Sequence, residues 1–387
     1  MIKRTIADKI MGYSKKYPVV TITGPRQSGK TTLCRSLFPE YKYYSLEDID
    51  TRHRALNDPK GFLYECIDTG AVIDEFQRAP ELTSYMQRIV DETNREGLFI
   101  LTGSQNFLFM KNVSQSLAGR TALATLLPFS YEEIYKTELK NINDILYTGF
   151  FPRIYDKKLN PTEAMRFYTT LYLERDFREL IDIKNLSVFE IFLKQAAART
   201  GQIMNMSNLA NDCGISVNTA KNWLSILEAA HLIYFLRPHY KNFNKRHIKA
   251  PKMYFTDTGL ACCLIDIREP QHIANHPLRG ALFETFIISE FLKRYYNNGQ
   301  NPPLFFFRDS TGNEVDIIIE KSGQFIPVEI KAGQTINSSF FKGLNFYYKL
   351  NSASQGNGIV IYNGQENQHR TDYKIINYAS LDSLDIF

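Results

Sequence analysis

The chain has 387 residues, of which 44% are hydrophobic and 22% are charged, and its formal net charge is +5. This composition predicts two or three globular domains and excludes a disordered or fibrous chain. No apolar run is long enough to span a bilayer, and the first ten residues lack the apolar core of a signal peptide. The five cysteines form no CxxC pair, which argues against a disulfide scaffold or structural zinc. These features predict a cytoplasmic protein with no membrane partner.

The segment Gly24–Thr31 follows the apolar run Val19–Ile22 and precedes a helical pattern over residues 32–38. A strand, a glycine loop and a helix start in this order predict a phosphate-binding loop, in which backbone N–H groups hold phosphate oxygens. We expect ATP with Mg²⁺ as the ligand. Lys30 would reach the β and γ phosphates, and the Thr31 hydroxyl would bind Mg²⁺. The other expected nucleotide contacts are Gly24, Gln27, Ser28, Gly29 and Thr32.

A second short apolar segment, residues 69–75, ends in Asp74 and Glu75 and has the form of a Walker B strand. Buried parallel strands are continuously apolar, and ligands gather at their carboxyl ends. Asp74 would therefore hold Mg²⁺, and Glu75 would polarise the attacking water. An ordinary strand with a solvated acidic turn is the alternative.

Two further polar positions are candidates for the same site. The apolar segment 98–105 ends in Ser104 and Gln105, and either side chain would lie beside the γ phosphate. Arg120 could neutralise transition-state charge in its own site or in a neighbouring copy, although a lone arginine is more often a surface residue.

The middle of the chain has a helix–turn–helix pattern over residues 206–228. Ser207 and Ser216 are expected to cap its two helices, with Gly214 in the turn. Residues 232–237 and 252–255 have the pattern of two strands flanking a wing. No acidic residue occurs between Glu228 and Asp257, which favours contact with a phosphate backbone, although winged helices also serve as lids or protein-docking modules. The basic residues of this interval are Arg237, Lys241, Lys245, Arg246, Lys249 and Lys252, and base edges would meet Asn218, Lys221 and Asn222.

The segment 313–331 predicts a β-hairpin with a turn at Ser322-Gly323. With a two-residue turn, the alternating apolar residues of both strands lie on one face of the hairpin, which supports the register. The same register sets Asp316 opposite Glu329, and facing carboxylates repel unless a cation lies between them. Mg²⁺ would suit this pair, with Lys331 stabilising an attacking hydroxide or a phosphate oxygen and Glu284 as a third acid.

The chain resembles, over almost its whole length, the bacterial and archaeal AAA+ ATPases near the signal-transduction (STAND-like) branch that carry a C-terminal domain of unknown function. The resemblance rests on Gly24–Thr32, Ile73–Leu82, Leu101–Gln105, Leu117–Arg120, Leu173–Asp176, Lys252–Leu260 and Val328–Ala332. It implies an α/β P-loop domain, a winged-helix middle and an end similar to the PD-(D/E)xK nucleases. Phe150 stands where many relatives carry a second glycine, so the role of Gly149–Pro152 at the nucleotide is open.

We therefore expect an AAA+-like ATPase domain at 1–155, a helical region with a winged helix at 156–265 and a nuclease-like domain at 266–387. The first hypothesis is a Mg²⁺-dependent ATPase whose nucleotide state moves the other two regions on DNA. The second is a nucleotide-gated switch or scaffold for a protein partner, with little turnover and with homo-oligomers possible. The third is an ATP-regulated nuclease that uses Glu284, Asp316, Glu329 and Lys331.

Overall fold

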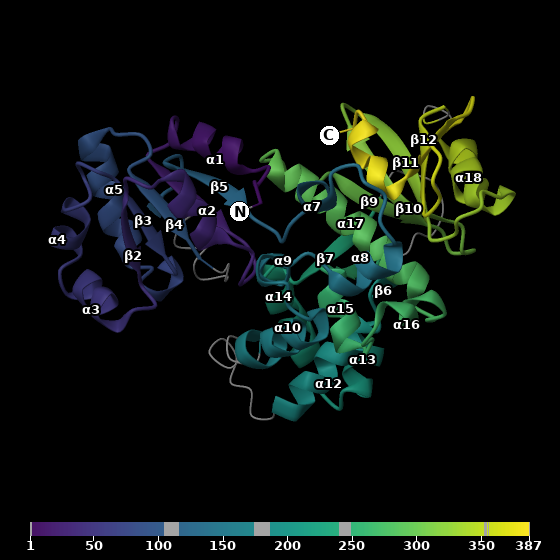
Figure 1. Ribbon diagram of the computed structural model, residues 1–387, viewed down its shortest axis with the longest axis horizontal. Helices are drawn as coiled ribbons and strands as arrows, with labels where there is room; N and C mark the ends of the chain where they lie inside the picture. Colours follow the sequence, from purple (N-terminus) through teal and green to yellow (C-terminus); the bar gives the residue numbers. More distant parts are fainter. Residues whose placement is uncertain are drawn as a thin grey trace.

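The structure is a computed structural model that describes residues 2–103, 116–173, 186–239, 249–351, 354 and 356–386. Its N-terminal part contains a five-stranded parallel sheet in the order β2-β3-β4-β1-β5 (Figure 1). The strands are β1 (Val19–Thr23), β2 (Lys42–Ser45), β3 (Ala71–Asp74), β4 (Phe99–Thr102) and β5 (Thr121–Thr125). The helices are α1 (Ala7–Ser14), α2 (Lys30–Leu37), α3 (Ile49–Asn57), α4 (Pro59–Tyr64) and α5 (Leu82–Thr93).

Helices cover both faces of this sheet. Ile10 of α1 and Leu33 of α2 belong to the apolar core on one face. Phe62 of α4 and Met86 of α5 belong to a separate core on the other face. Because both faces are covered, β1, β3 and β4 are buried along their whole length, as their apolar sequences predict. The predicted α/β class with a parallel sheet is confirmed.

The remainder of the chain surrounds a nine-stranded sheet in the order β13-β14-β12-β11-β10-β9-β7-β8-β6. Its strands are β6 (Gln202–Ile203), β7 (Ile233–Pro238), β8 (Lys252–Phe255), β9 (Leu304–Arg308), β10 (Glu314–Lys321), β11 (Gln324–Lys331), β12 (Gly358–Tyr362), β13 (Gln368–His369) and β14 (Tyr373–Asn377). The helices are α7 (Tyr131–Tyr135), α8 (Ile142–Thr148), α9 (Pro152–Lys157), α10 (Pro161–Tyr168), α12 (Leu186–Ala197), α13 (Met206–Asp212), α14 (Val217–Ala229), α15 (Thr258–Leu264), α16 (Pro270–Ala274), α17 (Arg279–Asn297) and α18 (Lys342–Leu350).

The two later regions are joined by their backbone. Strand β7 pairs in parallel with β9, with Arg237 opposite Phe305. One apolar core extends from Leu127 to Ile386 and includes residues of α12, α14, α17 and β11. The expected boundary after residue 265 thus falls within a single sheet and a single core, and the division into three domains stays a prediction.

Helices α13 and α14 form the predicted helix pair. Ser216 caps α14, since its Oγ accepts a hydrogen bond of 3.0 Å from the Thr219 N–H. The expected cap at Ser207 is wrong, because α13 begins at Met206, two residues earlier than a Ser207 cap requires, and Asn205 accepts from the Asn208 N–H at 3.0 Å. Gly214 lies in the turn with a φ of 65°. The apolar residues of this helix pair, Leu209, Ala210, Ala220, Trp223, Leu224 and Leu227, are all buried.

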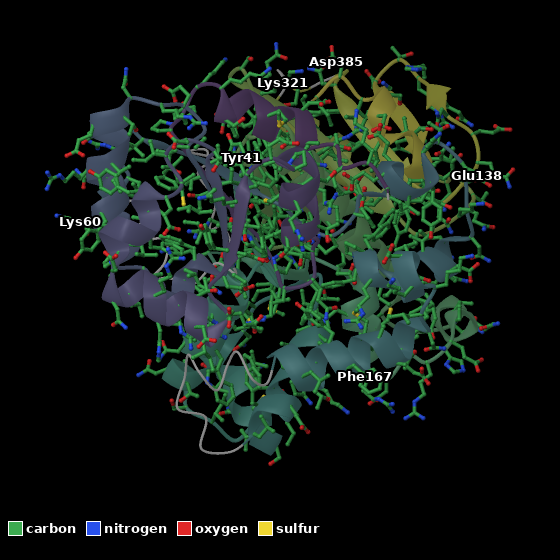
Figure 2. The ribbon with its side chains drawn as sticks, turned by 60° about the vertical axis from the view of Figure 1, so that its left-hand side comes forward. Tyr41, Lys60, Glu138, Phe167, Lys321 and Asp385 are labelled. Carbon is green, nitrogen blue, oxygen red and sulfur yellow. The ribbon has the colours of Figure 1, made fainter. Side chains whose placement is uncertain are left out.

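The hairpin of β10 and β11 has the predicted register, with Lys321 opposite Gln324 and Ile317 opposite Val328. The Lys321 ammonium at the turn donates a hydrogen bond of 2.9 Å to the carbonyl of Asp385, and Figure 2 labels both residues. The hairpin end is thereby tied to the last turn of the chain. The alternation of apolar residues and a two-residue turn were together sufficient to fix this register.

A buried carboxylate joins the end of α8 to α15. Asp257 accepts hydrogen bonds from the Phe150 N–H at 2.7 Å and the Leu260 N–H at 3.0 Å. Gly149 has a φ of 63°, and a Cβ there would be 2.3 Å from the Asp257 carboxylate and 2.7 Å from the Gly259 nitrogen. Glycine is therefore required for this close approach. The contact explains two of the sequence motifs, Gly149–Pro152 and Lys252–Leu260, as partners in packing.

In the ranges that the structure describes, no helix combines the length and the apolar character needed to cross a membrane.

Candidate nucleotide site

The phosphate-binding loop lies between the end of β1 at Thr23 and the start of α2 at Lys30. Gly24 has a φ of 144° and Gly29 a φ of 93°, backbone conformations that favour glycine. A Cβ at Gly24 would be 2.1 Å from the carbonyl oxygen of Leu126, next to β5. The backbone of the loop at Gly24 therefore packs directly against the backbone at Leu126.

We expect Gly24→Ala to lower the free energy of unfolding by about 2 kcal/mol or more, since the new Cβ overlaps a backbone oxygen at an unfavourable φ. Chemical unfolding curves measure the change. Gly12→Ala is the matched control, because Gly12 lies within α1 and a Cβ there meets no atom within 4 Å. Equal stability of Gly24→Ala and the unmodified protein would contradict this account of the loop.

Lys30 lies at the first position of α2, with only 6% of its surface exposed. Its ammonium donates hydrogen bonds to the carbonyls of Gly24 at 3.0 Å and Pro25 at 2.8 Å. Burial lowers the pKa of Lys30, while the nearby Glu75 and Asp74 carboxylates act in the opposite direction. Neutral carbonyls compensate the charge of a buried ammonium only in part. An anionic ligand such as a phosphate would therefore stabilise Lys30 further.

Ser28 and Arg4 show how the loop is held and what it leaves open. The buried Ser28 hydroxyl has no hydrogen-bond partner within the described part of the chain, as expected of a group that awaits a ligand. The Arg4 guanidinium donates to the Ser28 carbonyl at 2.8 Å and to the Leu127 carbonyl at 2.7 Å, and pairs with Glu133 at 3.2 Å. No motif in the sequence indicates Arg4, which acts only through the fold. The other two expected contacts, Gln27 with a φ of 60° and the exposed Thr32 of α2, lie on the same loop and helix.

The two expected Mg²⁺ residues are brought together. The Thr31 hydroxyl donates a hydrogen bond of 2.7 Å to the Asp74 carboxylate at the end of β3. Asp74 is 5% exposed and also accepts from the Tyr43 hydroxyl at 2.8 Å and from the Thr102 hydroxyl. Burial and this bond to Asp74 raise the pKa of Tyr43, which keeps it a proton donor. One carboxylate with a threonine suits Mg²⁺ at a phosphate site, where water and phosphate oxygens supply the other ligands.

Glu75 follows Asp74 in a left-handed conformation, with a φ of 54°. Its carboxylate accepts a hydrogen bond of 2.5 Å from the Gln77 side chain. A Cβ at Gly103 would be 2.3 Å from the Gln77 Oε1, so Gln77 packs against the end of β4. Gln77 thus holds the Glu75 carboxylate just after the end of β3. Gln77 is a positioning residue, and no local pattern in the sequence indicates that role.

His231, in the turn between α14 and β7, approaches this site from the second part of the chain. Burial and the positive charge of Lys30 lower the pKa of His231 to about 4. His231 and Leu127 line a cavity of about 350 Å³ together with Thr256 and Tyr296. The α13–α14 pair therefore contacts the neighbourhood of the phosphate loop through this turn, which no motif in the sequence indicates.

The pKa of His231 leads to a pH dependence of stability. The unfolded histidine, with a pKa near 6.5, binds a proton before the folded one, so the contribution of His231 to stability is constant above about pH 7 and falls as the pH drops toward 4. Between pH 7.5 and pH 5, we expect the unmodified protein to lose about 2 kcal/mol more than His231→Gln. Urea unfolding at both pH values measures this. His272→Gln, at an exposed position, is the control, and parallel curves for all three proteins would contradict the assignment.

Three further expected residues are Ser104, Gln105 and Arg120, of which the structure describes only Arg120. Ser104 and Gln105 lie outside the described residues, as do Lys241, Lys245 and Arg246 of the wing. Arg120 immediately precedes β5, and its carbonyl accepts from the Val19 N–H at the amino end of β1. Its guanidinium binds both oxygens of Asp91, at 2.6 and 2.8 Å. Because the phosphate loop follows the carboxyl end of β1, Arg120 does not fit a role in its own site. A role in a neighbouring copy stays a prediction.

The four expected nuclease-type residues lie close together in the C-terminal part. The Ile330 N–H donates to Asp316 at 2.7 Å, and the Lys331 ammonium lies 3.6 Å from Asp316 and contacts Glu329. Glu284 of α17 is bound instead by Lys252 of β8, at 2.9 Å. Across the described ranges, no group of three or more His, Cys, Asp or Glu side chains is arranged to hold a metal ion.

Three family models match consecutive parts of the chain. Residues 16–135 match the AAA domain. Residues 139–271 and 279–381 match two domains of unknown function, DUF8612 and DUF4143. The AAA-domain match and the loop geometry support a P-loop ATPase family, and with it ATP binding and hydrolysis.

Similar proteins and structures span most of the chain. An uncharacterized protein of Mycobacterium tuberculosis is 29% identical over 337 residues, which cover 86% of this chain and 74% of that protein. An uncharacterized protein of Methanocaldococcus jannaschii is 23% identical over 333 residues, covering 78% and 72% respectively. Among solved structures, a Walker-type ATPase of Pyrococcus abyssi has a TM-score of 0.47 at 14% identity, covering 68% of this chain and 96% of that one. AMPPCP-bound DnaA from Aquifex aeolicus has a TM-score of 0.32 at 16% identity, covering 58% and 85%.

Proposed function

We propose that the protein binds ATP with Mg²⁺ at the loop of residues 24–31 and hydrolyses it to ADP and phosphate. The observation that carries the proposal is the hydrogen bond of 2.7 Å between Thr31 and Asp74. It brings the hydroxyl of the loop and the carboxylate of the neighbouring strand to one point beside the Lys30 ammonium. Mg²⁺, when bound between these residues and the phosphates, supplies positive charge to the β and γ oxygens.

Each residue of the site has a separate role in this proposal. The loop N–H groups and Lys30 bind the phosphates and stabilise negative charge as the bond to the γ phosphate breaks. Glu75 accepts a hydrogen bond from the attacking water and orients it in line. Gln77 fixes the Glu75 carboxylate from one side, at 2.5 Å. Ser28, whose hydroxyl has no partner in the described chain, donates to the ligand.

Nucleotide state is passed to the α13–α14 pair through two contacts of the loop. Arg4 joins the Ser28 carbonyl to the Leu127 carbonyl, and Leu127 lines the cavity that His231 also lines. A loop that tightens on a phosphate would therefore move the turn at the end of α14. This path supports a protein in which ATP changes the position of α14.

The exposed face of α14 favours DNA as the partner. Asn218, Lys221 and Asn222 are all exposed, and the second helix of such a pair presents its outer face to base edges. A nucleotide-gated switch that binds a protein is the second candidate, and Val217, which is 44% exposed at the start of α14, favours it.

The test combines ATP turnover with DNA affinity. We expect Mg²⁺-dependent phosphate release from ATP and binding to duplex DNA with an affinity that falls as salt rises. Lys221→Gln should weaken DNA binding and reduce the salt slope by about one. No release of phosphate would contradict the ATPase, and DNA affinity unaffected by Lys221→Gln would favour the protein-binding switch.

A further inference from the structure

A lysine ammonium lies among the carboxylates of the C-terminal part, and no pattern in the sequence indicates this contact. We define the carboxylate cluster as Glu284, Glu314, Asp316 and Glu329. Lys252 enters this cluster from β8, two strands away from β9 in the sheet, and only 3% of its side chain is exposed. Its ammonium lies 2.9 Å from Glu284 and also contacts Glu314.

Each of the three carboxylates that would bind a divalent cation already accepts a hydrogen bond within the protein through at least one oxygen. Asp316 accepts from the Ile330 N–H at 2.7 Å, and Lys331 contacts Glu329. The other oxygen of Glu329 is covered by α18, since a Cβ at Gly343 would be only 1.9 Å from it. Glu284 accepts from the Tyr254 hydroxyl at 2.5 Å in addition to Lys252. These residues therefore do not fit Mg²⁺.

The charges of the cluster are also nearly balanced. Four carboxylates contact three cations. Two of the cations are Lys252 and Lys331, and the third is Arg308, which binds Glu314 at 3.0 Å. With every side chain ionised, the cluster and its three cations therefore carry a net charge of only −1. A divalent cation would add two positive charges to a site whose carboxylates are already largely compensated.

We propose that the Lys252 ammonium takes the place of a divalent cation in the carboxylate cluster, so that this nuclease-like site is metal-free and does not hydrolyse DNA. In this role Lys252 ties β8, next to the α13–α14 pair, to α17 and β10. Since removing one member of a buried ion pair leaves the partner charges uncompensated, loss of Lys252 opens a cation site. The proposal does not depend on the ATPase.

Mn²⁺ titration of the full-length chain without nucleotide tests this. Asp316→Asn isolates the cluster, because Asp316 lies outside the ATP site. We expect the unmodified protein and Asp316→Asn to bind Mn²⁺ equally. Lys252→Met should bind one more Mn²⁺ ion than the double variant Lys252→Met/Asp316→Asn. The Mn²⁺ affinity of Lys252→Met should be at least about tenfold higher than that of the unmodified protein. Lys252→Arg, which keeps the charge, should show no gain.

Two results would overturn the proposal. One is Mn²⁺ binding or DNA cleavage by the unmodified protein that Asp316→Asn removes. The other is a folded Lys252→Met, verified by circular dichroism, that gains no Mn²⁺. If Lys252→Met does not fold, the comparison of the unmodified protein with Asp316→Asn still decides between the two accounts.

Discussion

Lys30→Ala is expected to reduce ATP turnover at least about a hundredfold and to weaken ATP binding at the same time. The ammonium is buried at the start of α2 and is held by two loop carbonyls, which leaves its charge for the phosphates. Alanine removes both the ground-state contact and the stabilisation of the transition state. Phosphate release at saturating and limiting ATP separates the two effects.

The control for this variant is Lys42→Ala, at an exposed lysine of β2 in the same sheet. It should leave turnover within about twofold of the unmodified protein. Equal turnover by Lys30→Ala and the unmodified protein would mean that any measured ATPase activity arises elsewhere.

Glu75→Gln is expected to bind ATP with nearly unchanged affinity and to turn it over at least about a hundredfold more slowly. Glutamine preserves the size of the side chain and can still contact Gln77, but it lacks the charge that orients and polarises the water. Single-turnover measurements with a separate binding assay give the rate and the affinity independently.

Glu81→Gln, at an exposed position just before α5, provides the comparison for a lost surface charge. Its turnover should match the unmodified protein. Should Glu75→Gln hydrolyse ATP at the same rate as Glu81→Gln, the water would have to be oriented by another group.

The sequence predicted the parts of the site that depend on local patterns. The loop at Gly24–Thr31 and the acids after β3 follow from strand–turn–helix order and from the polarity of a strand end. The register of β10 and β11 follows from alternation and a two-residue turn. Each of these signals lies within about 20 residues of chain, where backbone conformation is set by neighbours.

Contacts between distant parts of the chain were not predicted, for a physical reason. Arg4, His231 and Lys252 reach their partners only when separate elements pack, and one sequence does not state which faces meet. Arg120 was assigned by residue type, yet its place before β5 puts it at the amino edge of the sheet. The Ser207 cap was wrong by two residues, because Asn205 is an equally good capping residue type.

Calorimetric titration of ATP in the presence of Mg²⁺ tests the central claim most directly. The account predicts saturable binding of one nucleotide per chain, lost or strongly weakened in Lys30→Ala. Absence of heat or of any thermal stabilisation by ATP in folded protein would contradict the nucleotide site and every function proposed for it.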